Sequence, residues 1–250
     1  MARLTGELAY DAAGRPSGRV AVVVNGPTSL RIDRIAERFG AEVHRTEVGE
    51  ANVVARAREL RGEGVLVRVL GEGSNGGTII HPSAVRDPLH TIHAVLKLLY
   101  ADASRESPSP RAIWTARCKA NQEDPAAPDL SGLIATLPRF ATTSAFEERA
   151  VMRIRSDSHA ALKREVERLL DAEVETIIAS LPAALEVTSH RIVNYERTTV
   201  RPGAGNRTGA ERGGLKVELV DDSGRARAFL WMRGSGTEPV FRVMADVEGD

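Results

Sequence analysis

Short runs of β-branched and aliphatic residues alternate with amphipathic stretches over the first hundred residues. Short apolar runs bounded by turn residues are typical of buried strands, whereas apolar residues three and four positions apart are typical of helices. The pattern predicts strands at 19–24, 41–46 and 65–70, a short strand ending at 80, and helices at 28–39, 50–61 and 88–100. This alternation predicts a layered α/β domain.

The last hundred residues follow a different order. An alternating run at 150–155 is followed by a long amphipathic helix at 158–181, and then strand patterns follow one another at 192–200, 215–220, 226–232 and 240–247. A helix that precedes several consecutive strands predicts an α+β domain, in which the helix covers one face of a sheet.

The middle of the chain is polar and rich in proline around 104–110 and 121–129, and these stretches flank an apolar patch at Ile113 and Trp114. We interpret 104–146 as a linker or surface insertion that includes a short helix at 130–138. The predicted organisation is an N-terminal segment at 1–18, a first domain at 19–103, the linker, and a second domain at 147–250.

Length, charge and cysteine content narrow the class of protein. A chain of 250 residues fits about two domains. Lysine plus arginine and aspartate plus glutamate both number 34, and this balance argues against nucleic acid as a main partner. Cys118 is the single cysteine, so no internal disulfide can form. The sequence has neither a signal peptide nor an apolar run of roughly 18 residues, so we expect a cytoplasmic protein without a membrane partner.

One turn near the carboxyl end gathers groups that bind anions. Two arginines, two hydroxyls and two glycines lie between two apolar strand patterns, at Arg233, Gly234, Ser235, Gly236, Thr237 and Arg242. Glycines allow successive backbone N–H groups to converge, and an arginine guanidinium matches the oxygens of a phosphate. A plain hairpin is the alternative, and these residues alone leave both interpretations open.

A second glycine-rich stretch satisfies the dinucleotide-binding pattern G-x-G-x-x-G, at Gly71, Gly73 and Gly76. That pattern requires a helix directly after the glycines, because the helix N-terminus holds the pyrophosphate. Residues 77–82 are instead β-branched and end in proline. We therefore expect no nucleotide at this loop.

The order Arg-x-Ser-Gly-Thr-Glu-Pro-x-x-Arg at 233–242 resembles the phosphate loop of the α-D-phosphohexomutases, which isomerise hexose 1- and 6-phosphates. Gly-Glu-x-Ser at 71–74 is similar to the family's sugar-recognition loop. The resemblance covers about 19–103 and about 150–248. It implies a three-layer α/β third domain followed by an α+β fourth domain with an antiparallel sheet, similar to the TATA-box-binding protein. It also implies sugar contacts from Glu72, Ser74 and Arg45, although Glu72 could instead pair with an arginine such as Arg68 and only stabilise the loop.

Two motifs of that family do not occur in these 250 residues. One is the serine loop, Thr-Ala-Ser-His-Asn-Pro, whose serine carries the transferable phosphoryl group. The other is the Asp-x-Asp-x-Asp-Arg loop that binds Mg²⁺. Ser144 is the nearest serine candidate but lacks the His-Asn-Pro, and the acidic pair Asp221 and Asp222 is typical of a turn. The chain therefore resembles domains three and four alone.

The resemblance implies an isomerase of carbohydrate metabolism, of the phosphoglucomutase or phosphomannomutase type, that works through a phosphoserine and a bisphosphate intermediate. We expect this chain to bind hexose phosphates and hexose bisphosphate but to be inactive alone. The catalytic serine and Mg²⁺ are expected outside it, in a partner N-terminal half that contains domains one and two. A non-catalytic phosphosugar-binding or sensor protein is the alternative.

Overall fold

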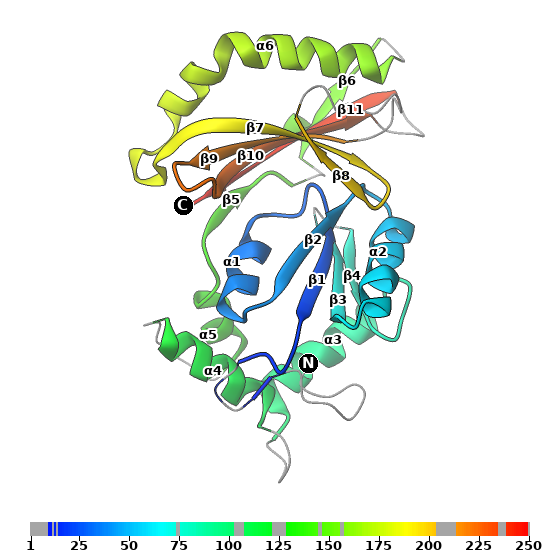
Figure 1. The fold of residues 1–250 in the computed structure, drawn as a ribbon, viewed down its shortest axis with the longest axis vertical. Coiled ribbons are helices and arrows are strands. Elements are labelled where there is room, and N and C mark those ends of the chain that lie inside the picture. Colours follow the sequence, from blue (N-terminus) through cyan, green and yellow to red (C-terminus); the bar gives the residue numbers. More distant parts are fainter. Residues whose placement is uncertain are drawn as a thin grey trace.

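Two separate sheets organise the chain, one in each of two units that lie one above the other in Figure 1. The computed structural model describes residues 10–11, 13, 15–73, 76–102, 108–121, 129–144, 147–155, 158–203, 214–234 and 239–249. The layered α/β unit followed by an α+β unit confirms the fold class predicted from the sequence. Among the described residues, no helix has the length and apolar character needed to cross a membrane.

The first sheet has the strand order β2-β1-β3-β4. Its strands are β1 (Val20–Asn25), β2 (Glu42–Thr46), β3 (Leu66–Glu72) and β4 (Gly77–Ile80). β1 pairs in parallel with both β2 and β3, whereas β4 is antiparallel to β3. The inner strand β1, Val-Ala-Val-Val-Val-Asn, is apolar because both of its faces are covered, whereas the edge strand β2, Glu-Val-His-Arg-Thr, is mostly polar.

Two helices cover this sheet, α1 (Arg31–Arg38) and α2 (Glu50–Gly62). The chain passes from β1 to β2 on one side and returns across β1 to β3 on the other. Right-handed crossovers therefore place the two helices on opposite faces, as Figure 1 shows. Val53, Ala57 and Leu60 of α2 are fully buried against the sheet, so this face forms the core of the unit.

The helices beyond β4 lie at the far end of the first unit (Figure 1). They are α3 (Pro88–Tyr100), α4 (Pro110–Ala120) and α5 (Leu130–Ala135). Of the apolar residues of α3, only Leu99 is buried, whereas Leu89 is 66% and Ile92 is 53% exposed. α3 therefore keeps most of its apolar side at the surface of the described structure.

The segments assigned to the N-terminal tail and to the linker take part in packing. Phe39 lies between Tyr10 and Trp114, with ring centroids 5.8 and 5.7 Å away, and Ile113 joins the same cluster. The predicted linker 104–146 thus contains α4, which packs on the first unit, and β5 (Phe140–Thr142), which belongs to the second sheet. The helical period at 110–120 was hidden by its polar, proline-rich flanks.

The second sheet has the strand order β5-β11-β10-β9-β7-β8, with β6 also paired to β11. Its remaining elements are β6 (Val151–Arg153), β7 (Val187–Glu196), β8 (Thr199–Pro202), β9 (Leu215–Asp221), β10 (Ala226–Gly234), β11 (Val240–Glu248), and the short 3-10 helices Glu148–Ala150 and Ala183–Leu185. All pairings in this sheet are antiparallel. The strand predicted at 192–200 is in fact two strands, β7 and β8, joined by a tight turn in which Arg197 has a φ of 52°.

The long helix α6 (His159–Ser180) covers the outer face of the second sheet, and the inner face lies on the first unit (Figure 1). Alternation along β9 separates the two faces. Leu215, Val217 and Leu219 pack beneath α6, whereas Lys216 and Glu218 point the other way, toward the first unit. The centre of the sheet at β9 is therefore buried on both faces, and its inner face carries charged groups, whereas the edge strand β8 is exposed.

Candidate functional site

The carboxyl ends of the parallel strands β1, β2 and β3 lie at the edge of the first sheet that faces the second unit. Open α/β sheets bind their ligands at this edge. Hydrogen bonds join the loops there: Gly26 N–H donates to Thr46 O at 2.9 Å, and Gly73 N–H donates to Thr28 Oγ1 at 2.9 Å. The loops at this edge are therefore held together by hydrogen bonds.

Glu72, the sugar-contact candidate, ends β3 at this edge and is only 5% exposed. Its Oε1 accepts a hydrogen bond from Gly49 N–H at 2.8 Å, and its Oε2 lies 3.5 Å from Arg86 Nη1. The arginine beside Glu72 is thus Arg86, and not Arg68. The carboxylate connects β3 to the loops that precede α2 and α3, and it is held in one orientation.

Arg45, the second sugar-contact candidate that the structure describes, is buried beneath the loop between β1 and α1. Its Nη1 donates to Thr28 O at 2.7 Å, and its Nη2 donates to Asp33 Oδ2 at 2.5 Å. Further donations reach the carbonyls of Gly26 and Ser29 at 3.3 and 3.4 Å. These bonds fix the loop, and a sugar contact by Arg45 stays a prediction. Ser74, the third candidate, lies outside the described residues.

The two arginines of the turn at 233–242, which we call the phosphate turn, lie side by side on neighbouring strands. Arg233 on β10 is the direct register partner of Arg242 on β11, so both side chains project from the same face. That face is the inner one, because Trp231, two residues earlier on β10, packs against Leu30 of the first unit. Ser235, Gly236 and Thr237 lie outside the described residues. Two like charges directly opposite each other on a sheet are unfavourable, and a bound anion would relieve the repulsion.

Gly234, the remaining described residue of the turn, is in contact with the first residue of α6. A Cβ built on Gly234 would lie 2.1 Å from His159 Cε1, so only glycine fits there. The His159 ring also lies 6.3 Å from the Phe241 ring. No sequence motif indicated His159, because its contact with the turn arises only when α6 packs over the sheet.

Glu47 connects the sugar-side loops to the phosphate turn. Its backbone N–H donates to Arg197 O at 2.8 Å, and its Oε2 accepts from Arg197 N–H at 3.0 Å. Its Oε1 lies 3.9 Å from Arg233 Nε. Glu47 also lies two residues before Gly49, the partner of Glu72. Glu72 and Arg233, one from each candidate loop, therefore lie on the same side of the molecule.

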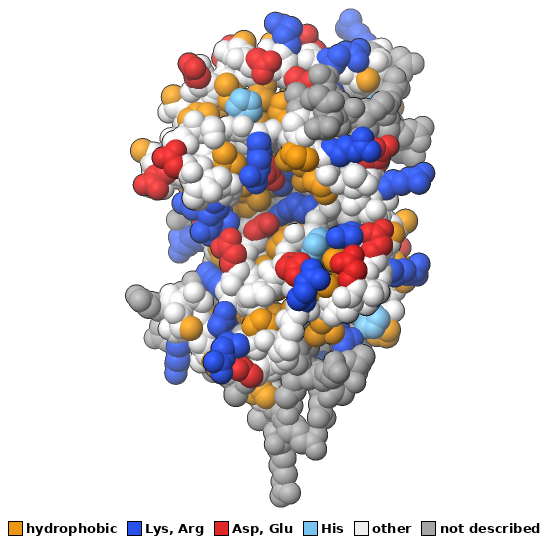
Figure 2. Space-filling model, in the orientation of Figure 1, with side chains coloured by type: hydrophobic (Ala, Val, Ile, Leu, Met, Phe, Trp, Pro, Cys, Tyr) orange, Lys and Arg blue, Asp and Glu red, His pale blue; other side chains and the backbone are white. Residues whose placement is uncertain are grey.

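Charged groups continue along the boundary between the units, where Figure 2 shows acidic and basic side chains interleaved. Lys216 Nζ lies 3.2 Å from Glu218 Oε1 and 4.1 Å from the centre of the Phe229 ring. Burial lowers the pKa of Lys216 to about 8, an effect that Arg45 increases and Glu218 opposes. Burial also raises the pKa of Tyr195, whose ring lies against Gly26.

The part of the chain that the structure describes does not form a recognisable magnesium site. Across the described ranges, no group of three or more histidine, cysteine, aspartate or glutamate side chains could hold a metal ion. Asp221 caps a turn, as the sequence predicts: its Oδ1 accepts from Ser223 N–H and Arg225 N–H, each at 3.0 Å, and Gly224 has a φ of 79°. The Asp221 carboxylate is thus engaged within its own turn, and the described residues offer no donor set for Mg²⁺.

Among solved structures, this chain is similar to the crystal structure of the exocytosis-sensitive phosphoprotein pp63/parafusin, a phosphoglucomutase from Paramecium, in its open form. The sequences are 14% identical, with a TM-score of 0.45, over 91% of this chain and 33% of that chain. The present chain therefore spans about a third of that protein's length. No curated protein matches this sequence.

Residues 4–114 match the family model described as phosphoglucomutase/phosphomannomutase, alpha/beta/alpha domain III. The match includes parts of the segments 1–18 and 104–146, which the sequence pattern alone placed outside the first domain. It agrees with the packing of Tyr10 and Ile113 on the first unit. Residues 4–114 of this chain are therefore a domain III of the phosphoglucomutase/phosphomannomutase family.

Proposed function

We propose that this chain binds hexose phosphates between its two units and supplies the sugar- and phosphate-recognition half of a phosphohexomutase. The observation that carries the proposal is the cross-strand pair Arg233 and Arg242, which projects toward the first unit on the side where Glu72 ends β3. The complete enzyme would interconvert hexose 1- and 6-phosphates through a phosphoserine and a hexose bisphosphate. The partner in this reaction would be an N-terminal half with domains one and two, in the cytoplasm.

The turn at 233–242 would hold the phosphate that is not reacting. Two guanidinium groups on one face of a sheet can bind a tetrahedral dianion from two directions, with charge-assisted hydrogen bonds. Such a cradle recognises the phosphate and not the direction of the sugar ring. It can therefore accept both orientations of a bisphosphate, and its binding energy can serve to position the distant reacting group.

Glu72 would accept hydrogen bonds from sugar hydroxyls. A carboxylate has about four acceptor positions, and Gly49 N–H and Arg86 occupy part of this capacity. These two contacts orient the carboxylate before a sugar arrives, which lowers the cost of ordering it on binding.

The phosphoryl transfer itself would depend on groups that this sequence does not contain. Neither the serine loop nor the Asp-x-Asp-x-Asp-Arg loop occurs in it. When bound in the complete enzyme, Mg²⁺ would stabilise the charge of the transferring phosphoryl group. No described residue of this chain fits that ion, so the roles proposed for this chain are binding and positioning.

The absence of these two motifs from the sequence also favours a second candidate, a non-catalytic phosphosugar-binding or sensor protein. Both candidates predict phosphosugar binding, but only the first predicts complementation. Mixing this chain with a domain one and two half should restore mutase activity if it belongs to a mutase. Binding without complementation by any matching half would favour the sensor.

Calorimetry with glucose 1-phosphate tests the binding proposal. We expect Arg233→Ala to weaken binding by roughly 1.5–3 kcal/mol, the contribution of one hydrogen bond to a charged group. Arg168→Ala is the matched control, because Arg168 is an exposed arginine on α6 that pairs with Glu165, far from the turn. An unchanged dissociation constant in Arg233→Ala would show that Arg233 does not bind the phosphate.

The same titration with Glu72→Gln tests the sugar contact. The glutamine carbonyl can still accept from Gly49 N–H, so the loop should keep its shape. We expect weaker binding of glucose 1-phosphate and unchanged binding of inorganic phosphate. Equal losses for both ligands would mean that Glu72 only stabilises the loops through Gly49 and Arg86.

A further inference from the structure

A pocket lies in the first unit, between α2 and the loop that follows β4. Its volume is about 310 Å³, and none of its lining residues belongs to the candidate site described above. The lining combines a basic side, formed by Arg58, Arg61 and His81, with an apolar side, formed by Val54, Leu70, Pro82 and Ala84, and includes Ser83.

The basic side has no acidic residue in its lining. Arg61 is fixed to the wall, because its Nε and Nη2 both donate to Val67 O, at 3.0 and 2.8 Å. Burial lowers the pKa of Arg61, and the charges of Arg68 and Arg58 lower it further. Burial likewise lowers the pKa of His81, with Arg61 and Arg68 adding to the effect. These groups from α2, β3 and the β4–α3 loop repel one another, which is the electrostatic environment that a bound anion would stabilise.

The apolar side limits the kind of anion. Val54 is 8% and Leu70 is 1% exposed, so both belong to the wall of the core. A sugar placed against this wall would lose hydrogen bonds to water without replacing them, at a cost of about 1–3 kcal/mol per hydroxyl. A volume of about 310 Å³ is at the small end of ligand pockets, yet it exceeds what a bare phosphate ion needs.

We propose that this pocket binds a phosphomonoester that carries a small apolar group. The dianionic phosphate would lie between Arg58, Arg61 and His81, and the organic group would lie against Val54, Leu70 and Pro82. This ligand is distinct from the hexose phosphates proposed for the turn at 233–242, so either proposal can fail without the other.

Phenyl phosphate is the probe, and the His81 imidazole is the reporter. The His81 proton signals are assigned by comparison with His81→Gln and followed by NMR over a pH series. A dianion beside the ring favours the imidazolium, so we expect saturating phenyl phosphate to raise the pKa of His81. We expect inorganic phosphate and glucose 1-phosphate to bind there at least tenfold more weakly.

Three variants separate this pocket from other sites. Arg58→Gln should weaken phenyl phosphate binding roughly tenfold, whereas Arg56→Gln, a neighbour on the same helix that pairs with Glu59, should leave it unchanged. Arg233→Ala should also leave the His81 response unchanged. The proposal is overturned if the pKa of His81 does not move, if Arg58→Gln has no effect, or if glucose 1-phosphate binds as tightly as phenyl phosphate.

Discussion

At the scale of single residues, Lys216 is the most unusual group of the second sheet. Its side chain is fully buried on the inner face, between the Glu218 carboxylate and the Phe229 ring. The Glu218 carboxylate also accepts a hydrogen bond from Arg191, whose Nε donates to Glu218 Oε2 at 2.7 Å. An ammonium group loses its hydration in such a place, so the neutral amine is favoured there more than in water.

The stability of the protein should therefore depend on pH through Lys216. Its pKa is about 8 in the folded protein and has an ordinary value of 10.5, so the unfolded chain binds the proton more tightly between these pH values. The free energy of unfolding should rise from pH 8 to pH 10, by on the order of 1–3 kcal/mol relative to Lys216→Met. Urea denaturation of both proteins measures the difference, and parallel pH profiles would contradict it.

Gly234 provides a second prediction at this scale. A Cβ there would overlap the His159 ring, so Gly234→Ala should destabilise the protein by about 1–3 kcal/mol. Removing the ring should relieve the overlap, and the double variant Gly234→Ala/His159→Ala should recover most of the loss relative to His159→Ala alone. Urea denaturation of the four proteins gives the coupling energy. A coupling near zero would show that another contact excludes the side chain.

At the scale of elements, the β7–β8 hairpin and the loop before α2 meet through Glu47. Two hydrogen bonds join the units, from Glu47 N–H to Arg197 O and from Arg197 N–H to Glu47 Oε2, and Oε1 of Glu47 faces Arg233. Glu47 is thus an anion already present beside the guanidinium that is proposed to bind phosphate.

Glu47→Gln should consequently tighten phosphate binding. The amide can still accept from Arg197 N–H, so the junction is kept, while the charge that competes for Arg233 is removed. A partly exposed ion pair at this distance contributes about 0.2–1 kcal/mol, so we expect an increase in affinity of about 1.4- to 5-fold. Calorimetry with glucose 1-phosphate measures it. A loss of affinity would mean that Glu47 positions Arg233 instead of competing for it.

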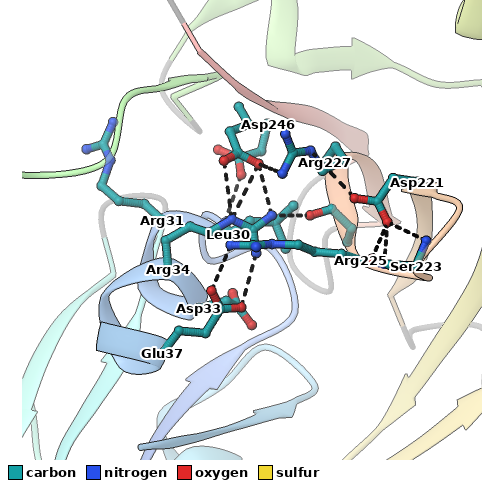
Figure 3. A network of polar contacts seen from close by, with 12 residues as sticks. Leu30, Arg31, Asp33, Arg34, Glu37, Asp221, Ser223, Arg225, Arg227 and Asp246 are labelled. Carbon is teal, nitrogen blue, oxygen red and sulfur yellow. Dashed lines mark hydrogen bonds and ion pairs between the residues drawn. The ribbon is translucent and has the colours of Figure 1, made fainter. Parts of the chain in front are cut away.

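At the scale of the whole molecule, a network of polar contacts joins α1 to the second sheet, as Figure 3 shows. Asp246 of β11 is fully buried, and its Oδ2 accepts from Leu30 N–H at 2.8 Å. The start of α1 is therefore capped by a side chain of the other unit. Around it, Arg34 Nη2 lies 2.9 Å from Glu248 Oε2, and Arg225 Nη2 lies 2.7 Å from Glu37 Oε2.

Loss of this cap should weaken the docking of the two units. Asp246→Ala leaves Leu30 N–H buried without an acceptor, at an expected cost of about 2–3 kcal/mol. We expect differential scanning calorimetry to show the units unfolding in two separate transitions in this variant. Asp222→Ala, in the exposed turn after β9, is the control and should behave like the unmodified protein. A single transition at an unchanged temperature would exclude Asp246 as the main link.

Contacts between residues that lie far apart in the chain could not be predicted from the sequence. Glu47 meets Arg197, His159 meets Gly234, and Asp246 meets Leu30, each across a long stretch of chain. None of these pairs forms a local pattern. The side chain of Arg45 illustrates the same limit, because the sequence did not indicate that its donors hold the loop between β1 and α1.

The sequence by itself determined the order and type of most elements, because hydrophobic periodicity and turn residues act within a few positions of one another. The amphipathic pattern at 158–181 predicted a helix over one face of the sheet. Leu162, Val166 and Leu170 of α6 do pack there, whereas Leu169 is 47% exposed. The sequence also indicated Arg233 and Arg242 as phosphate-binding candidates, and the structure shows that they are register partners on neighbouring strands. Only the tertiary structure decided that α4 packs on the first unit, that 192–200 forms a hairpin, and that Glu47 lies between the two loops. These features depend on which surfaces meet when the sheets pack, and that is a property of the whole chain.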